Sequence, residues 1–96
     1  MLVSKRIKVG KKQILAVLIK LASNNLILLK GKRGYVMCGY LNMVVANKFG
    51  DVAVKITGVS TIKQALGSRA VSISAEAKKV GIKRNQSVQD ILKIIA

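Results

Sequence analysis

The pattern of apolar and polar positions divides the chain into a first third typical of β-strands and a remainder in which helical and strand patterns alternate. Residues 4–9 alternate between apolar and mostly basic side chains, as in a strand with one solvated face. Residues 13–21 and 26–29 are apolar without alternation, and residues 35–38 form a fourth short run. Turns rich in glycine, serine, asparagine and lysine separate these runs, so we expect an antiparallel β meander.

The rest of the chain predicts helices with strands between them. We expect helices at residues 41–49, 61–66, 75–80 and 88–95, and strands at residues 51–57 and 70–73. The candidate helix caps are Asn42, Ser60 or Thr61, Ser74 and Ser87. In the first helix, Leu41, Val44 and Val45 share a stripe that we expect to face the core. The prediction is one α+β domain over residues 1–96, with an N-terminal antiparallel β meander followed by a compact mixed αβαβα portion.

The apolar strands of the first third also bear on assembly. Residues 13–21 and 26–29 present apolar side chains on both faces, yet the short helices that follow suffice to cover only one face of a sheet. We therefore predict that residues 1–33 form a β-rich oligomerisation region through which copies of the chain associate, whereas residues 34–96 form the mixed α/β portion. The alternative is a monomer whose second face carries exposed leucines.

The strong positive charge of the chain adds a further class of possible partner. The chain carries 18 Lys and Arg against three acids, Asp51, Glu76 and Asp90, which gives a formal net charge of +15. Such an excess attracts polyanions, so nucleic acid is an alternative partner, with sequence-independent phosphate contacts. The candidate residues are Lys78, Lys79, Lys83 and Arg84. A solvated basic face is the competing interpretation, since only three aromatic residues are available for base stacking.

Composition excludes several kinds of chemistry. The chain has no histidine and one cysteine, so it offers no Cys-His pair, no imidazole ligand and no internal disulfide, and we expect neither a metal nor a cofactor. No dinucleotide fingerprint or phosphate-binding P-loop is present. Lys20 and two asparagines interrupt the most apolar run, residues 14–29, so we expect no membrane span. A lone cysteine fits a reducing compartment, and we expect a cytoplasmic protein.

One junction stands out chemically, at the predicted end of strand 35–38 and the start of helix 41–49. Free backbone N–H groups gather at such junctions, so Cys38, Gly39, Tyr40 and Asn42 form a candidate site for a small ligand or anion. Cys38 is the only catalytic candidate: the helix dipole and the nearby Lys32 or Arg33 would favour its thiolate. The alternatives are a buried core cysteine and a capping Asn42. Whether the chain is an enzyme stays open.

Several segments together resemble a known family. They are Gly34-Tyr35-Val36-Met37-Cys38-Gly39-Tyr40-Leu41-Asn42, Ala46-Asn47, Gly50-Asp51, Thr57-Gly58-Val59 and Gly81-Ile82-Lys83. From about residue 31 to its end, the chain resembles the YunC-like family of bacteria and archaea, a domain of unknown function. The resemblance implies a mixed α/β domain whose N-terminal β region mediates homo-oligomer formation, described as tetramerisation. It implies no activity and therefore no catalytic residues. Asn85 stands where a glycine is usual, and asparagine tolerates a positive φ better than most residues.

Overall fold

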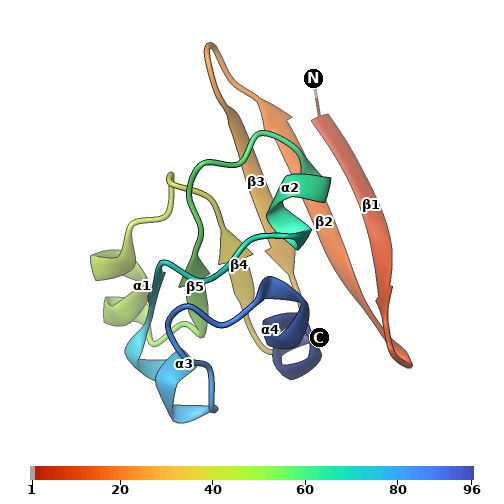
Figure 1. Cartoon of the computed structure of the whole chain (residues 1–96). Coiled ribbons are helices and arrows are strands. Elements are labelled where there is room, and N and C mark those ends of the chain that lie inside the picture. Colours follow the sequence, from red (N-terminus) through yellow and green to blue (C-terminus); the bar gives the residue numbers. More distant parts are fainter. Residues whose placement is uncertain (1) are drawn as a thin grey trace.

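The computed structural model describes residues 2–96, and its strands form one six-stranded sheet (Figure 1). The strands are β1 (Leu2–Val9), β2 (Lys12–Lys20), β3 (Asn25–Lys30), β4 (Tyr35–Met37), β5 (Ala53–Lys55) and β6 (Ser72–Ile73). Their order in the sheet is their order in the chain. β1 to β4 pair antiparallel, β4 and β5 pair parallel, and β5 and β6 pair antiparallel. The predicted meander and the α+β fold class are therefore confirmed.

Within residues 2–96 the helices are α1 (Met43–Phe49), α2 (Ile62–Leu66), α3 (Ala75–Lys79) and α4 (Val88–Ile95). Each begins after a polar cap whose side chain accepts backbone N–H bonds, namely Asn42, Thr61, Ser74 and Ser87. The parallel step from β4 to β5 requires a crossover, and α1 supplies it. All predicted helices exist: the bounds of α4 are as predicted, and those of the other three helices differ at one end by one or two residues.

One face of the sheet carries the main core. The register pairs Ala16 with Leu29 and Leu18 with Ile27, so these side chains lie on the same face. α2 contacts β2 and α4, and α4 buries Val88, Ile91, Leu92 and Ile95. Figure 1 shows α2 and α4 in front of this face. The two short helices α2 and α4 therefore cover this face of the central strands.

The opposite face of β1 to β3 is less covered, and we call it the open face. The pairing of Val17 with Leu28 and of Ile19 with Leu26 places these residues there, together with Leu15. Leu15, Val17 and Leu28 are half-buried and belong to neither buried cluster of the described residues. At the edge of the face, Leu2 is 65% exposed. An apolar row therefore remains on the side of the sheet away from α2 and α4.

The predicted stripe of helix 41–49 is wrong for Val44 and Val45, whereas Leu41 is buried as expected. Leu41 precedes the helix, Val44 is 78% exposed and Val45 is also exposed, whereas Ala46 is the buried residue of α1. Ala46 packs with Leu41 and Ala53 in a small second cluster. The reason is the length of the helix: two turns placed over the edge of β4 and β5 bury one small side chain.

Two strands are shorter than predicted. The segment 51–57 contributes only Ala53–Lys55, and the segment 70–73 contributes only Ser72–Ile73. The N–H of Ala70 donates instead to the carbonyl oxygen of Gln86, which ties the segment to the loop before α4. Asn85 has φ 65°, a left-handed conformation that asparagine tolerates better than most residues. No helix in residues 2–96 is long and apolar enough to cross a membrane.

Candidate ligand site at the end of strand β4

Cys38 directly follows β4 and makes an unusual contact with β3. Its N–H donates to the carbonyl oxygen of Ile27 at 3.1 Å, as an antiparallel ladder requires, but the N–H of Ile27 donates to the Cys38 Sγ at 3.3 Å. The carbonyl oxygen of Cys38 accepts instead from the N–H of Leu41 at 3.0 Å. The sulfur therefore takes the place of the carbonyl in the ladder, and the chain turns out of the sheet at this residue.

The Cys38 side chain is 4% exposed and lies in the main core cluster. Its Sγ also lies 3.9 Å from the carbonyl oxygen of Asn25, to which the thiol can donate. The expected support for a thiolate is missing here. Gly39–Leu41 separate Cys38 from the Asn42 cap of α1, and Lys32 and Arg33 lie before β4, at its other end.

Three loops enclose a hollow of about 510 Å³ beside this residue, which we call the junction hollow. The β2–β3 turn contributes Asn24 and Asn25, the β4–α1 loop contributes residues 38–40, and the β5–α2 loop contributes residues 58–60. All three loops lie toward the upper end of the sheet in Figure 1. The Asn25 Nδ2 donates to the carbonyl oxygen of Ser60 at 2.9 Å, so two of the walls are tied together.

Four residues that line the junction hollow have backbone N–H groups without a hydrogen-bond partner in residues 2–96. A Cβ added at Gly39 or Gly58 would meet no atom within 4 Å, so both glycines border open space. Among the described residues, no acceptor takes a hydrogen bond from the N–H groups of Gly39, Tyr40, Gly58 or Val59. Unpaired N–H groups beside a hollow are available to a ligand that carries hydrogen-bond acceptors.

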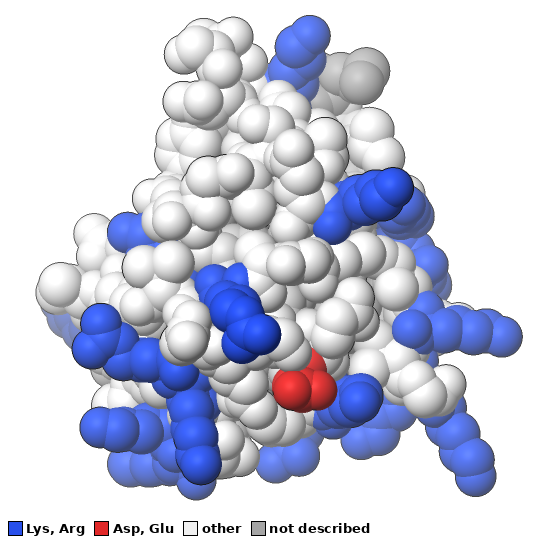
Figure 2. All heavy atoms as spheres, in the orientation of Figure 1, with Lys and Arg blue, Asp and Glu red and all other residues white. Residues whose placement is uncertain are grey.

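The junction hollow lies in a weakly charged part of the molecule. No Lys, Arg, Asp or Glu lines it. Figure 2 shows the upper part of the same view mostly white, whereas Lys and Arg gather over the lower left and along the right edge. Within residues 2–96, no group of three His, Cys, Asp or Glu residues comes together. The hollow can therefore offer hydrogen bonds, but little long-range attraction.

The residues singled out from the sequence divide into two groups. Cys38, Gly39 and Tyr40 line the junction hollow, whereas Asn42 does not. The Asn42 Oδ1 accepts from the N–H groups of Val44 at 3.1 Å and Val45 at 3.3 Å, so Asn42 caps α1.

Sequence reasoning missed two of the three walls. Asn24 and Asn25 were recognised only as a turn, and residues 58–60 only as part of a segment before a helix. Gly58 has φ +72°, which explains the glycine but does not reveal which other loops it meets. The available signal was the Thr57-Gly58-Val59 segment of the family resemblance.

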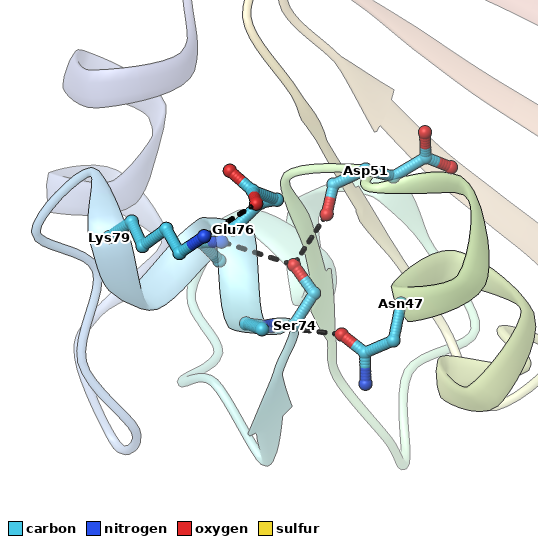
Figure 3. A network of polar contacts seen from close by, with 7 residues as sticks. Asn47, Asp51, Ser74, Glu76 and Lys79 are labelled. Carbon is cyan, nitrogen blue, oxygen red and sulfur yellow. Dashed lines mark hydrogen bonds and ion pairs between the residues drawn. The ribbon is translucent and has the colours of Figure 1, made fainter.

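The candidate nucleic-acid residues also divide. Lys78, Lys83 and Arg84 line a second hollow of about 340 Å³, together with Ile73, Gly81 and Ile82. Lys79 points elsewhere, because its Nζ pairs with the Glu76 Oε1 at 3.1 Å (Figure 3). The loop that carries Lys83 is held in place, since the Lys83 N–H donates to the Gln86 Oε1 at 3.0 Å.

The buried residue Ser74 connects α3 to the start of β5 through hydrogen bonds of its hydroxyl group. Ser74 is 1% exposed, and its Oγ donates to the carbonyl oxygen of Asp51 at 2.6 Å. The same Oγ accepts from the N–H groups of Ala53 at 3.0 Å and Ala77 at 3.1 Å. Figure 3 shows Ser74 between Asp51 and α3, with Asn47 of α1 alongside. Ser74 therefore has a structural role that connects α3 to β5.

Comparison with known proteins gives a consistent result. Residues 37–95 match the model of a family described as Domain of unknown function (DUF1805). The chain is 35% identical over 81 residues to the uncharacterized protein YunC of Bacillus subtilis, and the match covers 80% of each chain. It also superposes on the crystal structure of TA1206, a protein of unknown function from Thermoplasma acidophilum, with a TM-score of 0.96 and 36% identity over 100% of this chain and 94% of the other. The chain therefore belongs to the DUF1805 family of YunC-like domains, and the resemblance inferred from its sequence is confirmed.

Proposed function

We propose that this chain is a self-associating, cytoplasmic domain that binds a small, acceptor-bearing ligand in the junction hollow. The observation that carries the ligand site is the convergence of three loops, two of which carry N–H groups without a hydrogen-bond partner among the described residues, at Gly39, Tyr40, Gly58 and Val59. Sites for small molecules usually combine a concave surface of a few hundred Å³ with a few polar groups of fixed direction. The junction hollow has both properties.

The chemistry of the lining favours a carbonyl or carboxylate group on the ligand. Backbone N–H groups donate to either acceptor, and the amides of Asn24 and Asn25 add hydrogen-bonding capacity at the rim. No lysine or arginine lines the hollow, so the site does not depend on a full negative charge. An uncharged carbonyl compound therefore competes on nearly equal terms with an anion.

An NMR titration of the ¹⁵N-labelled protein with acetamide and with acetate tests this site. We expect both probes to shift the amide resonances of Gly39, Tyr40, Gly58 and Val59. In Gly39→Leu the Cβ would meet no atom of the described residues within 4 Å, so the leucine side chain can fill the hollow. We therefore expect this variant to abolish the shifts. Gly67→Leu is the matched control, because Gly67 lies outside the hollow and has only ordinary contacts. Unchanged resonances with both probes would remove the ligand site.

Self-association rests on the open face of β1 to β3. Leu15, Val17 and Leu28 stand there half-buried, with Leu2 and Ile19 exposed at the edge. Removing this row from water favours association by about 25 cal/mol per Å² of apolar surface. A second copy supplies a matching surface, because a two-fold interface brings the same patch of each subunit together.

A thiol-dependent activity is the alternative that uses the same hollow. Cys38 lines this hollow, but its Sγ is hydrogen-bonded to the backbone of β3. The residue is only 4% exposed. We expect a disulfide reagent to modify Cys38 at pH 7 more slowly than it modifies a free-thiol standard, because burial restricts access. Modification faster than the standard would instead favour the thiol-dependent alternative.

Charge-driven nucleic-acid binding is a second candidate, favoured by the gathering of Lys78, Lys83 and Arg84 around one hollow. Fluorescence anisotropy with a labelled single-stranded oligonucleotide across a salt series tests it. We expect binding that weakens steeply as salt rises. Lys83→Ala/Arg84→Ala should weaken it more than Lys11→Ala/Lys12→Ala, which removes the same charge from the β1–β2 turn. Absence of binding at low salt would exclude this function.

A further inference from the structure

A third hollow, of about 350 Å³, lies at the opposite end of β4 and plays no part in the proposed function. The β3–β4 turn contributes Lys32 and Arg33, and the α1–β5 connection contributes Asp51. Lys30 and Tyr35, which face one another across β3 and β4, also line it. We call it the basic hollow. It brings together the Gly34-Tyr35 and Gly50-Asp51 segments, which the junction hollow does not use.

The backbone of the basic hollow is firmly held. Within the turn, the N–H of Gly31 donates to the carbonyl oxygen of Gly34 at 2.8 Å. The N–H of Arg33 donates to the carbonyl oxygen of Ile95 at 2.8 Å, which anchors the turn to α4. A Cβ at Gly34 would lie 2.6 Å from the carbonyl oxygen of Val52, so this close approach needs glycine. The backbones of Lys32 and Arg33 are therefore fixed before any ligand arrives.

Among the described residues, the cations of the basic hollow have no acidic partner. The ion pairs within residues 2–96 are Lys79–Glu76 and Lys93–Asp90, and neither involves Lys30, Lys32 or Arg33. The one acid of the lining, Asp51, is held by a different group. The Tyr35 hydroxyl donates to the Asp51 Oδ2 at 2.9 Å. The lining therefore carries three positive charges and one negative charge, a net charge of +2.

The Tyr35–Asp51 contact fixes what the carboxylate can do. Burial, followed by the hydrogen bond to Asp51 and the charge of that carboxylate, raises the pKa of Tyr35 to about 12, so the phenol keeps its proton at neutral pH. Oδ2 is thus occupied. Among the described residues, no group donates a hydrogen bond to the other carboxylate oxygen, Oδ1. Oδ1 repels a bare anion but accepts a hydrogen bond from a hydroxyl group.

We infer that the basic hollow binds a small phosphorylated polyol, with the phosphate group at Lys32 and Arg33 and a neighbouring hydroxyl group donating to Asp51. Arginine and lysine are the usual partners of phosphate in proteins. A carboxylate beside them selects a ligand that carries a donor next to its phosphate, because a phosphate alone meets repulsion from Asp51 without compensation.

Isothermal titration calorimetry with two phosphate monoesters tests this inference. Glycerol 3-phosphate carries hydroxyl groups and methyl phosphate does not, whereas their phosphate groups are alike. At constant ionic strength, we expect the protein to bind glycerol 3-phosphate about fivefold more tightly, the net value of one ordinary hydrogen bond. Equal affinities for the two esters, or no binding of either, would overturn the inference.

Asp51→Asn provides the sharpest comparison. It keeps an oxygen that accepts from the Tyr35 hydroxyl but removes the negative charge. We expect methyl phosphate to bind more tightly to Asp51→Asn than to the unmodified protein, and the preference for glycerol 3-phosphate to shrink. A preference that persists undiminished in this variant would contradict the role of Asp51.

Lys32→Ala/Arg33→Ala should weaken the binding of both esters about tenfold or more, since hydrogen bonds to charged groups are each worth more than neutral ones. Lys11→Ala/Lys12→Ala removes equal charge from the β1–β2 turn, so it should leave both affinities within about twofold. Equal weakening by the two double variants would show that only the net charge of the molecule attracts phosphate, and would overturn the inference. Circular dichroism checks that each variant is folded.

Discussion

Two residues, Ser74 and Tyr35, make side-chain hydrogen bonds that connect distant parts of the chain. Ser74 connects three backbone groups through one hydroxyl, and Tyr35 holds the only acid of the basic hollow. Ser74 was predicted as a helix cap, because serine before an acidic first turn is typical of that position. Its other partners, Asp51 and Ala53, lie more than twenty residues away in the chain, so no local sequence pattern indicates these hydrogen bonds.

Ser74→Ala should therefore destabilise the fold more than the loss of an ordinary cap. We expect the free energy of unfolding to fall by about 2–3 kcal/mol, because the buried N–H groups of Ala53 and Ala77 and the partly buried carbonyl oxygen of Asp51 lose their partner. Ser87→Ala is the control: its Oγ accepts one bond, from the Asp90 N–H, and its loss should cost about 1 kcal/mol. Urea denaturation measures both, and equal costs would contradict the role of Ser74.

Tyr35 gives the stability a pH dependence in the alkaline range. Its pKa is raised from 10.0 to about 12 in the folded protein, so folding favours the protonated phenol. The contribution is fully present below pH 10 and is lost as the pH rises towards 12. We expect the difference in unfolding free energy between the unmodified protein and Tyr35→Phe to shrink over that range. A difference that stays constant from pH 9 to pH 12 would be inconsistent with this contact.

At the level of elements, β4 positions two of the three hollows. The chain enters β4 from the basic hollow and leaves it at the junction hollow, and this short strand pairs with β3 and β5. Its neighbour α1 contributes few apolar contacts, since Ala46 is its only buried residue. The stability of α1 therefore depends strongly on its caps, Asn42 at the start and Gly50, with φ 70°, at the end.

Asn42→Ala distinguishes a cap from a ligand-binding residue. We expect a loss of about 1 kcal/mol in stability, because the N–H groups of Val44 and Val45 lose their acceptor. The acetamide-induced shifts of the junction hollow should remain, because Asn42 does not line it. Asn42→Asp keeps the capping oxygen and should retain most of the stability. If Asn42→Ala abolishes the shifts in a folded protein, Asn42 takes part in binding.

At the scale of the whole molecule, an uncovered apolar face and a large positive charge oppose one another. The open face favours association, whereas a net charge of +15 makes two copies repel. Salt decides the balance, because the Debye length falls from about 30 Å at 0.01 M to about 10 Å at 0.1 M. We therefore expect self-association to strengthen with salt, whereas nucleic-acid binding would weaken.

Val17→Arg places a charge in the middle of the open face and should abolish the self-association that we propose. Val44→Arg is the matched control, since Val44 is 78% exposed on α1 and away from the sheet, so the oligomer should persist. Light scattering of both variants at 0.1 M salt measures the mass. A monomeric unmodified protein, or equal effects of the two variants, would refute association through the open face.

The amino-acid sequence alone was enough to predict the meander, the helices and their caps, and the positive φ of Asn85, because each depends on residues close together in the chain. It also showed the family, through segments such as the one from Gly34 to Asn42. Local periodicity did not decide which apolar residues of α1 are buried, since that depends on how far a short helix overlaps the sheet.

Which loops meet became known only from the three-dimensional fold. Asn25 and Ser60 are 35 residues apart, yet they close one hollow, and Tyr35 meets Asp51 across the parallel step from β4 to β5. Strand β4 separates Cys38 from Lys32 and Arg33, because Cys38 follows its last residue whereas Lys32 and Arg33 precede its first. Short-range patterns specify strands and helices, but a site formed by several loops depends on strand order and register, which arise only when the whole sheet assembles.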